Sequence, residues 1–273
     1  MRRSQLPVER TWHVFARGVR RLALFYEDRD YREFLLFLQE ALILSGCALY
    51  GYVLMGNHYH LILRGSQAQL STCMKRLNWR YALYHNDTHR MGGHVFDGPY
   101  KCFPQRTLMW LLWRLAYVFA NPVNAGLTTR AEDYPWSGLK AFLGEPGSPI
   151  QVTPFSDFKE LGRTPDEAKR YFRGLMKEVV SRTAGRSSGV PTAAEIQSEQ
   201  FAWVCHHARE RTQRVSEIDW ETLALWWGLE MGIPPRIMVK ALGLPSRHEV
   251  RNRVRRLKER LASDPDLFRR LAL

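Results

Sequence analysis

Residues 47–64 read CALYGYVLMGNHYHLILR, and this stretch decides the fold of the chain. Its two halves, residues 47–55 and 58–64, are rich in the aromatic, aliphatic and β-branched residues that strands favour. Gly56 and Asn57 separate them, and a glycine-bearing break between two such runs is typical of a β-hairpin. The stretch therefore predicts two neighbouring antiparallel strands.

The segments next to this hairpin predict a strand and two helices. Residues 11–24 have an extended pattern in which side chains alternate. Residues 30–44 carry apolar residues at helical spacing and stop at Ser45-Gly46, so we expect an amphipathic helix. A second helix is expected over residues 71–85, with Ser71 as its N-cap.

The order of the elements indicates the fold class. A strand is expected within residues 94–103 and an apolar helix over 107–120, ending near Asn121 because Pro122 disfavours helical geometry in the residue before it. The order is then strand, helix, strand, strand, helix, strand, helix. It predicts an α+β domain with a largely antiparallel sheet and its helices packed on one face.

The second half of the chain is predicted to be helical. A flexible linker is expected over residues 181–193. Helices are expected over residues 166–181, 194–211, 218–231, 234–242 and 247–261. The last two, joined by a Gly-Leu-Pro turn, follow one another as in a helix-turn-helix module. We therefore predict a domain over residues 1–145, a connector over 146–193 and a small all-α domain over 194–273.

Composition and charge narrow the class of protein. The 273 residues are 45% hydrophobic, which excludes wholesale disorder, and no apolar run is long enough to cross a membrane. Four cysteines without a Cys-x-x-Cys pair, and no secretory signal, fit a cytoplasmic protein. The net charge is +13, of which residues 246–273 contribute +5. Nucleic acid is therefore the expected partner. The alternative is that the excess charge only keeps the surface solvated.

Two histidines in the hairpin are candidate metal ligands. His58 and His60 are two residues apart in a strand, so both side chains project from the same face of the sheet. Two adjacent imidazoles can chelate one divalent ion. The alternative is two structural histidines on one face, and the His-x-His pattern alone leaves both open.

The apolar helix carries a second pair of candidates. Tyr117 and Asn121 are four residues apart and lie on one helical face. The phenol is a possible nucleophile, and the amide oxygen is a hard ligand acceptable to Mg²⁺ or Mn²⁺. The alternative is a core tyrosine and a helix-ending asparagine. The other histidines, among them His13, His85 and His89, are interpreted as structural or surface residues, and no phosphate-binding loop or Gly-x-Ser-x-Gly motif is present.

Four ordered blocks give these candidates a family context. They are GYVLMGNHYHLILRG, GGHVFDGPYKC, LAYVFANPVNAGL and EDYPWSGLKAFLG, at residues 51–65, 92–102, 115–127 and 132–144. Together they resemble the REP-associated tyrosine transposases, which belong to the single-tyrosine HUH transposase superfamily. The resemblance covers about the first 145 residues and implies a ferredoxin-like, RRM-like palm.

The resemblance also implies roles for the candidates. His58 and His60 match the metal-binding pair, Asn121 the third ligand of the Mg²⁺ or Mn²⁺ ion, and Tyr117 the catalytic tyrosine that forms a 5′-phosphotyrosine link. The chain departs from the family pattern at Phe119, Asn124 and Pro99, which puts its DNA sequence preference in doubt.

Single-stranded hairpin DNA is the substrate that the resemblance implies. Basic residues are expected to contact its phosphates, with Trp79, Tyr81 and Tyr100 available for base stacking. The basic candidates in the first domain are Arg17, Arg20, Arg21, Lys75, Arg76, Arg80, Lys101 and Arg106. A single basic residue of this kind is more often an ordinary solvated side chain, so the prediction is that these residues together form a DNA-binding patch.

The last basic helix resembles the recognition helix of a DnaA-like helix-turn-helix domain. Duplex DNA is its expected partner, and its candidate contacts are Arg247, His248, Arg251, Asn252 and Arg255. The alternative is a basic helix that packs on the first domain or binds RNA.

The sequence therefore predicts a metal-dependent, single-tyrosine DNA endonuclease and strand transferase of the transposase type, acting as a monomer or homodimer. The alternatives are a replication-initiator or relaxase-type nickase and a catalytically silent DNA-binding repressor.

Overall fold

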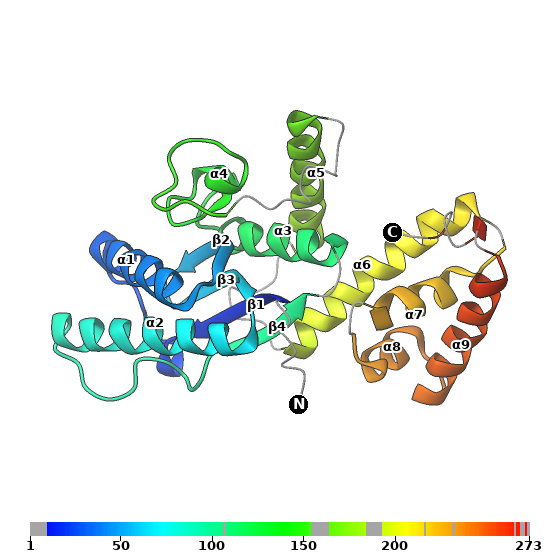
Figure 1. The fold of residues 1–273 in the computed structure, drawn as a ribbon, viewed down its shortest axis with the longest axis horizontal. Coiled ribbons are helices and arrows are strands. Elements are labelled where there is room, and N and C mark those ends of the chain that lie inside the picture. The colour runs from blue at the N-terminus through cyan, green and yellow to red at the C-terminus, as the bar shows by residue number, and fades with distance from the viewer. Residues whose placement is uncertain are drawn as a thin grey trace, which may run out of the picture. The chain divides into compact units, whose positions relative to one another are not determined.

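The predicted hairpin joins two strands at one side of a four-stranded sheet (Figure 1). In the computed structural model the strands pair in the order β2-β3-β1-β4, and every neighbouring pair is antiparallel. They are β1 (Arg10–Arg17), β2 (Ala48–Met55), β3 (His58–Gly65) and β4 (Lys101–Gln105). The expected order of strands and helices, and the α+β class with an antiparallel sheet, are confirmed.

The structure describes residues 10–105, 108–153, 164–183, 193–215, 217–230, 233–264, 266–267 and 271. Two compact units, Met1–Ser188 and Gly189–Leu273, make up the chain. Arg106 and most of the predicted linker lie outside the described residues, and the domain limits predicted from the sequence stay predictions. Among the described residues, no helix is long and apolar enough to cross a membrane.

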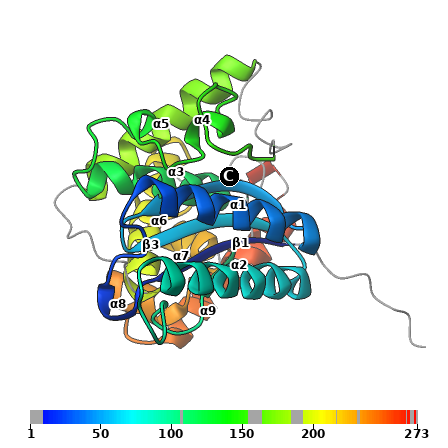
Figure 2. The same cartoon turned by 90° about the vertical axis from the view of Figure 1, so that its left-hand side faces the viewer.

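Helices cover both faces of the sheet, and this corrects the expectation of one covered face. On one face Tyr59 of β3 packs on Phe34 of α1 (Asp28–Ser45) and donates its hydroxyl to Asn78 of α2 (Gln67–Thr88) at 2.6 Å. These two helices run alongside each other (Figures 1 and 2). β3 is buried at every position except Arg64, so other elements cover both of its faces.

The second face is covered by α3 (Leu108–Asn124). Gly51 of β2 allows this approach, since a Cβ there would lie 2.8 Å from side-chain carbons of Leu115 and Phe119. Gly51 is paired with Ile62, which lies on the same side of β3 as His58 and His60. The helix that carries Tyr117 therefore packs on the histidine face.

Three element limits differ from those expected. The N-cap of α2 is Ser66, whose side chain accepts from the backbone N–H of Gln69, so the helix begins before Ser71. The strand candidate of residues 94–103, with its expected interruption at Gly98-Pro99, forms a strand only as β4, which extends to Gln105; Gly98 has a left-handed φ of 82°. Helix α3 continues through Pro122 to Asn124 instead of ending near Asn121.

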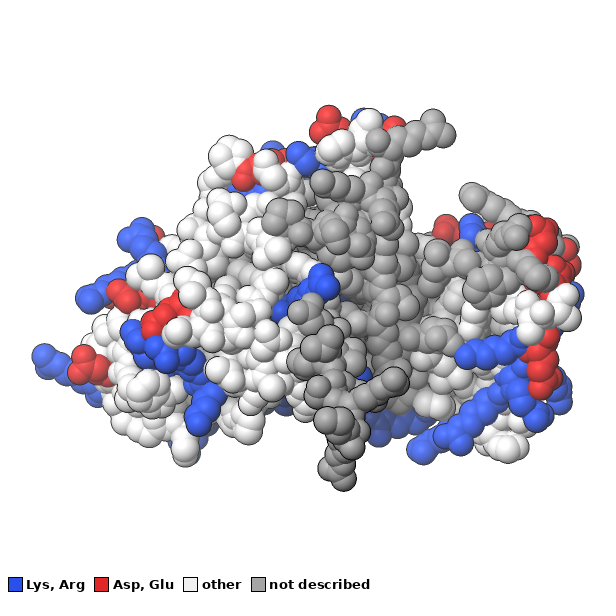
Figure 3. All heavy atoms as spheres, in the orientation of Figure 1, with Lys and Arg blue, Asp and Glu red and all other residues white. Residues whose placement is uncertain are grey.

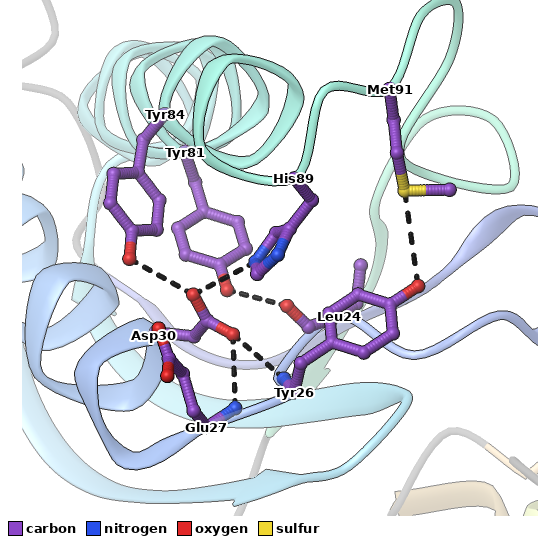
Figure 4. Close-up of polar contacts among 8 residues, drawn as sticks. All are labelled: Leu24, Tyr26, Glu27, Asp30, Tyr81, Tyr84, His89 and Met91. Atoms are coloured by element: carbon purple, nitrogen blue, oxygen red, sulfur yellow. Dashed lines mark hydrogen bonds and ion pairs between the residues drawn. The ribbon is translucent and has the colours of Figure 1, made fainter.

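A buried carboxylate ties α1 to α2 (Figure 4). Asp30 is fully buried and accepts hydrogen bonds from the backbone N–H groups of Tyr26 and Glu27 and from the hydroxyl of Tyr84, with His89 Nε2 at 3.0 Å. Burial raises the pKa of Asp30, but these hydrogen bonds outweigh it and the net pKa is lowered. The carboxylate is a structural feature of the helix layer.

Residues 131–153 cover the outer edge of β2. The backbone of β2 forms three hydrogen bonds with this segment. The N–H of Leu54 donates to Trp136 O, and the N–H groups of Gly138 and Thr153 donate to Tyr52 O and Leu49 O. The segment contains the 3-10 turn η2 (Ala131–Asp133) and the short helix α4 (Leu139–Phe142). Helix α5 (Pro165–Thr183) then packs on α3 through Phe172 and Phe119. The sheet edge is thus protected from pairing with other strands.

The second unit is helical, as expected. It contains α6 (Ala193–Arg214), α7 (Trp220–Glu230), α8 (Pro235–Leu242) and α9 (Arg247–Ser263). Helix α8 ends at Gly243 in a left-handed conformation, and Ser246 caps α9 by accepting from the N–H of Glu249. The apolar stripe of α9 is buried and leaves its basic side chains outside.

Candidate active site

His58 and His60 lie side by side on the face of the sheet that α3 covers. In the register of β3, His58 is opposite Arg17 and Met55, and His60 is opposite Phe15 and Val53. The ring centroids of the two histidines are 5.2 Å apart and the rings are nearly perpendicular, at 87°. The strand pairing thus brings the predicted metal pair together.

The Nδ1 atom of each ring lies at hydrogen-bonding distance from a neighbouring polar atom. His58 Nδ1 lies 2.7 Å from Asn57 Oδ1, and His60 Nδ1 lies 2.9 Å from His13 Nε2. Among the residues that the structure describes, His60 Nε2 is buried and has no hydrogen-bond partner. A neutral imidazole whose Nδ1–H is donated offers its Nε2 lone pair to a metal ion. The pair therefore fits a metal site.

Burial keeps the imidazoles neutral. It lowers the pKa of His58 to about 4, and the charge of Arg17 adds to this effect. Burial also lowers the pKa of His13 and of His60, and Arg114 contributes to both shifts. Near neutral pH each imidazole is therefore uncharged and has one unprotonated nitrogen, the form that can bind a metal ion.

His13 is a residue of the site that the sequence interpretation missed. The sequence favours a structural or surface role for it, whereas in the structure its ring stacks on that of His60 with centroids 5.1 Å apart. The strand alternation of residues 11–24 puts His13 on one face with Phe15 and Arg17. Only the pairing of β1 with β3 brings it next to His60.

Arg114 is a second such residue, and it lies close to both Tyr117 and the histidines. Its guanidinium carbon is 5.6 Å from the ring centroid of Tyr117 and 5.4 Å from that of Trp113. It is also near enough to His13 and His60 to lower their pKa by its charge, after the larger effect of burial. The helix thus presents a buried cation beside the predicted nucleophile.

Tyr117 and Asn121 occupy consecutive turns of α3. The Tyr117 ring stacks on Trp113 with centroids 5.5 Å apart. Asn121 donates from Nδ2 to the carbonyls of Tyr117 at 2.8 Å and Val118 at 3.1 Å. Its Oδ1 then remains as an acceptor, which is the atom that a metal ligand uses.

The donor set restricts how a metal ion could bind. Among the described residues, no three histidine, cysteine, aspartate or glutamate side chains gather as a metal site. His58, His60 and Asn121 would be neutral ligands, whereas Arg17 and Arg114 are nearby cations that would oppose a bare divalent ion. An anionic phosphate would offset that repulsion, so these residues fit a metal held together with DNA.

The site is closed to solvent in this structure. The relative exposure of His58 is 3%, of His60 0% and of Tyr117 6%. Any ligand of Tyr117 would therefore require the groups that bury it to move.

The basic candidates of the first unit lie on different sides of the sheet. Arg17 and Lys101 project on the histidine face, and Arg17 forms an ion pair with Asp97 at 2.6 Å. Arg20 and Arg21 are exposed beside the hairpin and have left-handed φ angles of 52° and 63°, a strained conformation for such residues. Arg17, Arg20 and Arg21 thus lie near the end of β3 that carries His58, and Lys101 lies across β1 from His60.

The cations of α2 belong to the opposite face. Arg76 and Arg80 both pair with Glu40 of α1, while Lys75 is exposed. Figure 3 shows the acidic side chains among the cations over these two helices. Of the aromatic candidates here, Trp79 is 60% exposed, but Tyr81 is buried and bonds to Leu24 O, so it is not available to stack on a base.

The basic residues of α9 form a separate stripe (Figure 3). Arg247, Arg251 and Arg255 are exposed and spaced by four, so they lie on one face of the helix. Arg253 is different, since it bonds to Glu249 at 2.9 Å and to Glu221 at 3.0 Å. It ties α9 to α7, whereas the three exposed arginines make no such contact with α7 in the described residues; Arg255 pairs only with Glu259 of its own helix, at 4.0 Å.

Comparisons with known proteins give weak structural matches. No family model matches the sequence, and no curated protein does. One similar solved structure is a REP-associated tyrosine transposase bound to a REP hairpin, with a TM-score of 0.42 and 15% identity, covering 57% of this chain and 95% of that one. Another is a "putative transposase" from Deinococcus radiodurans R1, with a TM-score of 0.31 and 16% identity, covering 38% of this chain and 85% of that one. The scores are low, so the evidence for a function lies in this chain's own residues.

Proposed function

We propose that the first unit is a metal-dependent, single-tyrosine DNA endonuclease and strand transferase, with the chemistry of a transposase. The observation that carries the proposal is that α3, the helix of Tyr117, packs on the sheet face from which His58 and His60 project, with Arg114 of that helix near both Tyr117 and His60. The ordered sequence blocks shared with REP-associated tyrosine transposases support the same assignment.

His58 and His60 would hold a Mg²⁺ or Mn²⁺ ion through Nε2, and Asn121 through Oδ1. When bound, the ion supplies positive charge at the scissile phosphate, which stabilises the charge that develops during attack. Asn57, whose Oδ1 lies 2.7 Å from His58 Nδ1, orients that ring. The protein thus contributes three neutral ligands and the groups that orient them.

Tyr117 is the nucleophile in this mechanism. Its Oη attacks the phosphorus, the bond from phosphorus to the 3′ oxygen breaks, and the phenolic proton leaves while the 3′ oxygen gains one. The downstream strand is then joined to Tyr117 through its 5′ phosphate. Attack by a 3′ hydroxyl reverses the step and rejoins a strand without an external energy source, because one phosphodiester replaces another.

Arg114 favours the attack. A phenol ordinarily has a pKa of about 10, so an unassisted tyrosine is protonated near neutral pH. The guanidinium 5.6 Å from the ring centroid of Tyr117 favours the phenolate and the additional negative charge of the transition state.

The proposed substrate is single-stranded DNA with a hairpin beside the cleavage site. The proposed phosphate contacts near the metal are Arg17, Arg20 and Arg21, close to the His58 end of β3, and Lys101, on the same face of the sheet. In the second unit, α8 and α9 are proposed to bind duplex DNA as a helix-turn-helix, with Arg247, Arg251 and Arg255 as contacts.

A catalytically silent DNA-binding repressor is the second candidate function. The burial of His58, His60 and Tyr117 favours it, because a repressor needs no access to these side chains.

A cleavage assay distinguishes the two. The full chain is incubated with Mn²⁺ or Mg²⁺ and labelled hairpin-bearing single strands, and products are separated under denaturing conditions. The proposal expects a protein–DNA adduct that needs the metal and is lost in Tyr117→Phe. Specific binding of the same DNA without an adduct under either metal would favour the repressor.

A further inference from the structure

A histidine on the neighbouring strand completes the hydrogen bonding of His60. His13 lies on β1 and His60 on β3, and His13 Nε2 is 2.9 Å from His60 Nδ1. Both rings are fully buried and stack with an interplanar angle of 22°. Two nitrogens at this distance share one proton in a hydrogen bond.

The direction of that bond decides whether His60 can bind a metal. If His60 Nδ1–H donates to His13, the Nε2 of His60 carries a lone pair. If His13 Nε2–H donates instead, a neutral His60 is protonated at Nε2 and cannot be a ligand there. His13 Nδ1 and His60 Nε2 are both buried without a hydrogen-bond partner among the described residues, so the pair is isolated from other groups that would fix its direction.

We propose that His13 is a positioning residue of the metal site: it accepts the Nδ1–H of His60, fixes the plane of that ring and leaves Nε2 for the metal ion. The inference rests on the proposed function, because it assigns a partner to one of the proposed ligands. Asn57 is the corresponding partner of His58, with its Oδ1 at 2.7 Å. Each ligand imidazole would thus have one outer partner, an arrangement usual for metal-binding histidines.

A purely structural role for His13 makes a different prediction. Replacing a buried polar pair member by an apolar residue of similar shape mainly changes stability, and by little when packing is kept. The site of His13 suits such a replacement, because its ring packs against Phe15 at a centroid distance of 5.4 Å. Metal affinity is therefore the readout that separates positioning from packing.

The test uses two variants of the full chain, His13→Phe and His13→Gln. Phenylalanine keeps a ring but no acceptor, whereas glutamine offers an oxygen that can accept from His60. Mn²⁺ binding is measured by titration calorimetry with hairpin DNA present and uncleavable. We expect His13→Phe to weaken binding about 10- to 100-fold and His13→Gln to recover most of that loss. His94→Ala is the matched control, since His94 is exposed, and should bind as the wild type does.

The outcomes separate this inference from the proposed function. If wild-type protein binds Mn²⁺ through His60, as judged by its loss in His60→Ala, but His13→Phe binds equally well, the role of His13 is refuted and the metal site stands. If His60→Ala leaves Mn²⁺ binding unchanged, His60 is not a metal ligand. The proposed metal site is then refuted, and the inference about His13 with it.

A spectroscopic measurement on unmodified protein covers the case in which His13→Phe does not fold. Long-range ¹⁵N–¹H correlation reports which nitrogen of a neutral histidine carries the proton. We expect the wild-type protein with Mg²⁺ and uncleavable hairpin DNA bound to have His60 protonated at Nδ1 and His13 Nε2 unprotonated. The opposite tautomer of His60 would overturn the inference.

Discussion

Asn121 Nδ2 donates a hydrogen bond of 3.1 Å to the carbonyl oxygen of Val118. That carbonyl is the one which residue 122 would bond in a regular helix, but Pro122 has no N–H to offer. The asparagine side chain supplies the missing donor and allows α3 to continue to Asn124. The same orientation leaves Oδ1 for a metal ion.

Asn121 therefore has two roles that substitutions can separate. Asn121→Ala removes both, so we expect a loss of about 1 kcal/mol in unfolding free energy and weaker metal binding. Asn121→Asp removes the donor but keeps an oxygen ligand, so it should lose similar stability while retaining metal affinity. Denaturant unfolding and metal titration check the two effects. Equal loss of metal affinity in both variants would contradict the ligand role.

The hydrogen bond from Asn121 explains why the C-terminal end of α3 could not be predicted from the sequence. The rule that a helix ends before proline holds when no other group bonds the exposed carbonyl, and the side-chain geometry is not visible in sequence. The hairpin was predictable because Gly56 and Asn57 separate two apolar runs at strand length.

Two residues of the candidate site were not predictable for a related reason. His13 meets His60 across a strand pair 47 residues apart in sequence, and Arg114 faces the histidines only because α3 packs on that face. The His-x-His pair and the Tyr117–Asn121 pair are local patterns, so sequence spacing alone was enough to propose them.

Asp30→Asn tests the buried carboxylate that ties α1 to α2. The amide keeps the shape but loses the charge that four donor groups surround, so we expect a loss of about 2 kcal/mol in unfolding free energy at pH 7. Asp28→Asn is the control, because Asp28 is exposed, and should change stability by less than about 0.5 kcal/mol. Urea unfolding measures both, and equal effects would contradict the role of Asp30.

The stability difference between the wild type and Asp30→Asn should depend on pH, because the pKa of Asp30 is lowered in the folded protein. Its folded-state pKa lies below the ordinary value of 3.8, so its contribution is complete above that value and is lost as the pH falls through the folded pKa. The gap in unfolding free energy between wild type and Asp30→Asn should therefore narrow below about pH 4. A gap that stays constant down to pH 2 would contradict a charged Asp30.

Arg114→Met tests the buried cation beside the site. Without its charge, Mn²⁺ should bind more tightly to DNA-free protein, because repulsion at His60 falls. The rate of adduct formation should fall about 100-fold, since the charge near Tyr117 is gone. Metal titration measures the expected gain in Mn²⁺ affinity, and single-turnover kinetics measure the expected fall in the rate of adduct formation. Thermal unfolding shows whether the variant is folded. A faster reaction would contradict the role assigned to Arg114.

The basic stripe of α9 predicts a salt-dependent affinity for duplex DNA. Replacing Arg247, Arg251 and Arg255 together by alanine should reduce the slope of log affinity against log salt concentration by about 3. Arg256→Ala serves as the control, because Arg256 is exposed on another side of α9. Fluorescence anisotropy at several salt concentrations gives the slopes. An unchanged slope in the triple variant would exclude the stripe as the duplex contact.

The attachment point of the DNA tests the central claim most directly. The adduct formed with hairpin-bearing single strands in Mn²⁺ is digested with protease and nuclease, and the modified peptide is sequenced by mass spectrometry. Our account predicts one 5′-phosphorylated nucleotide on Tyr117 and on no other residue. A nucleotide on another side chain, or cleaved DNA with no peptide adduct, would contradict it.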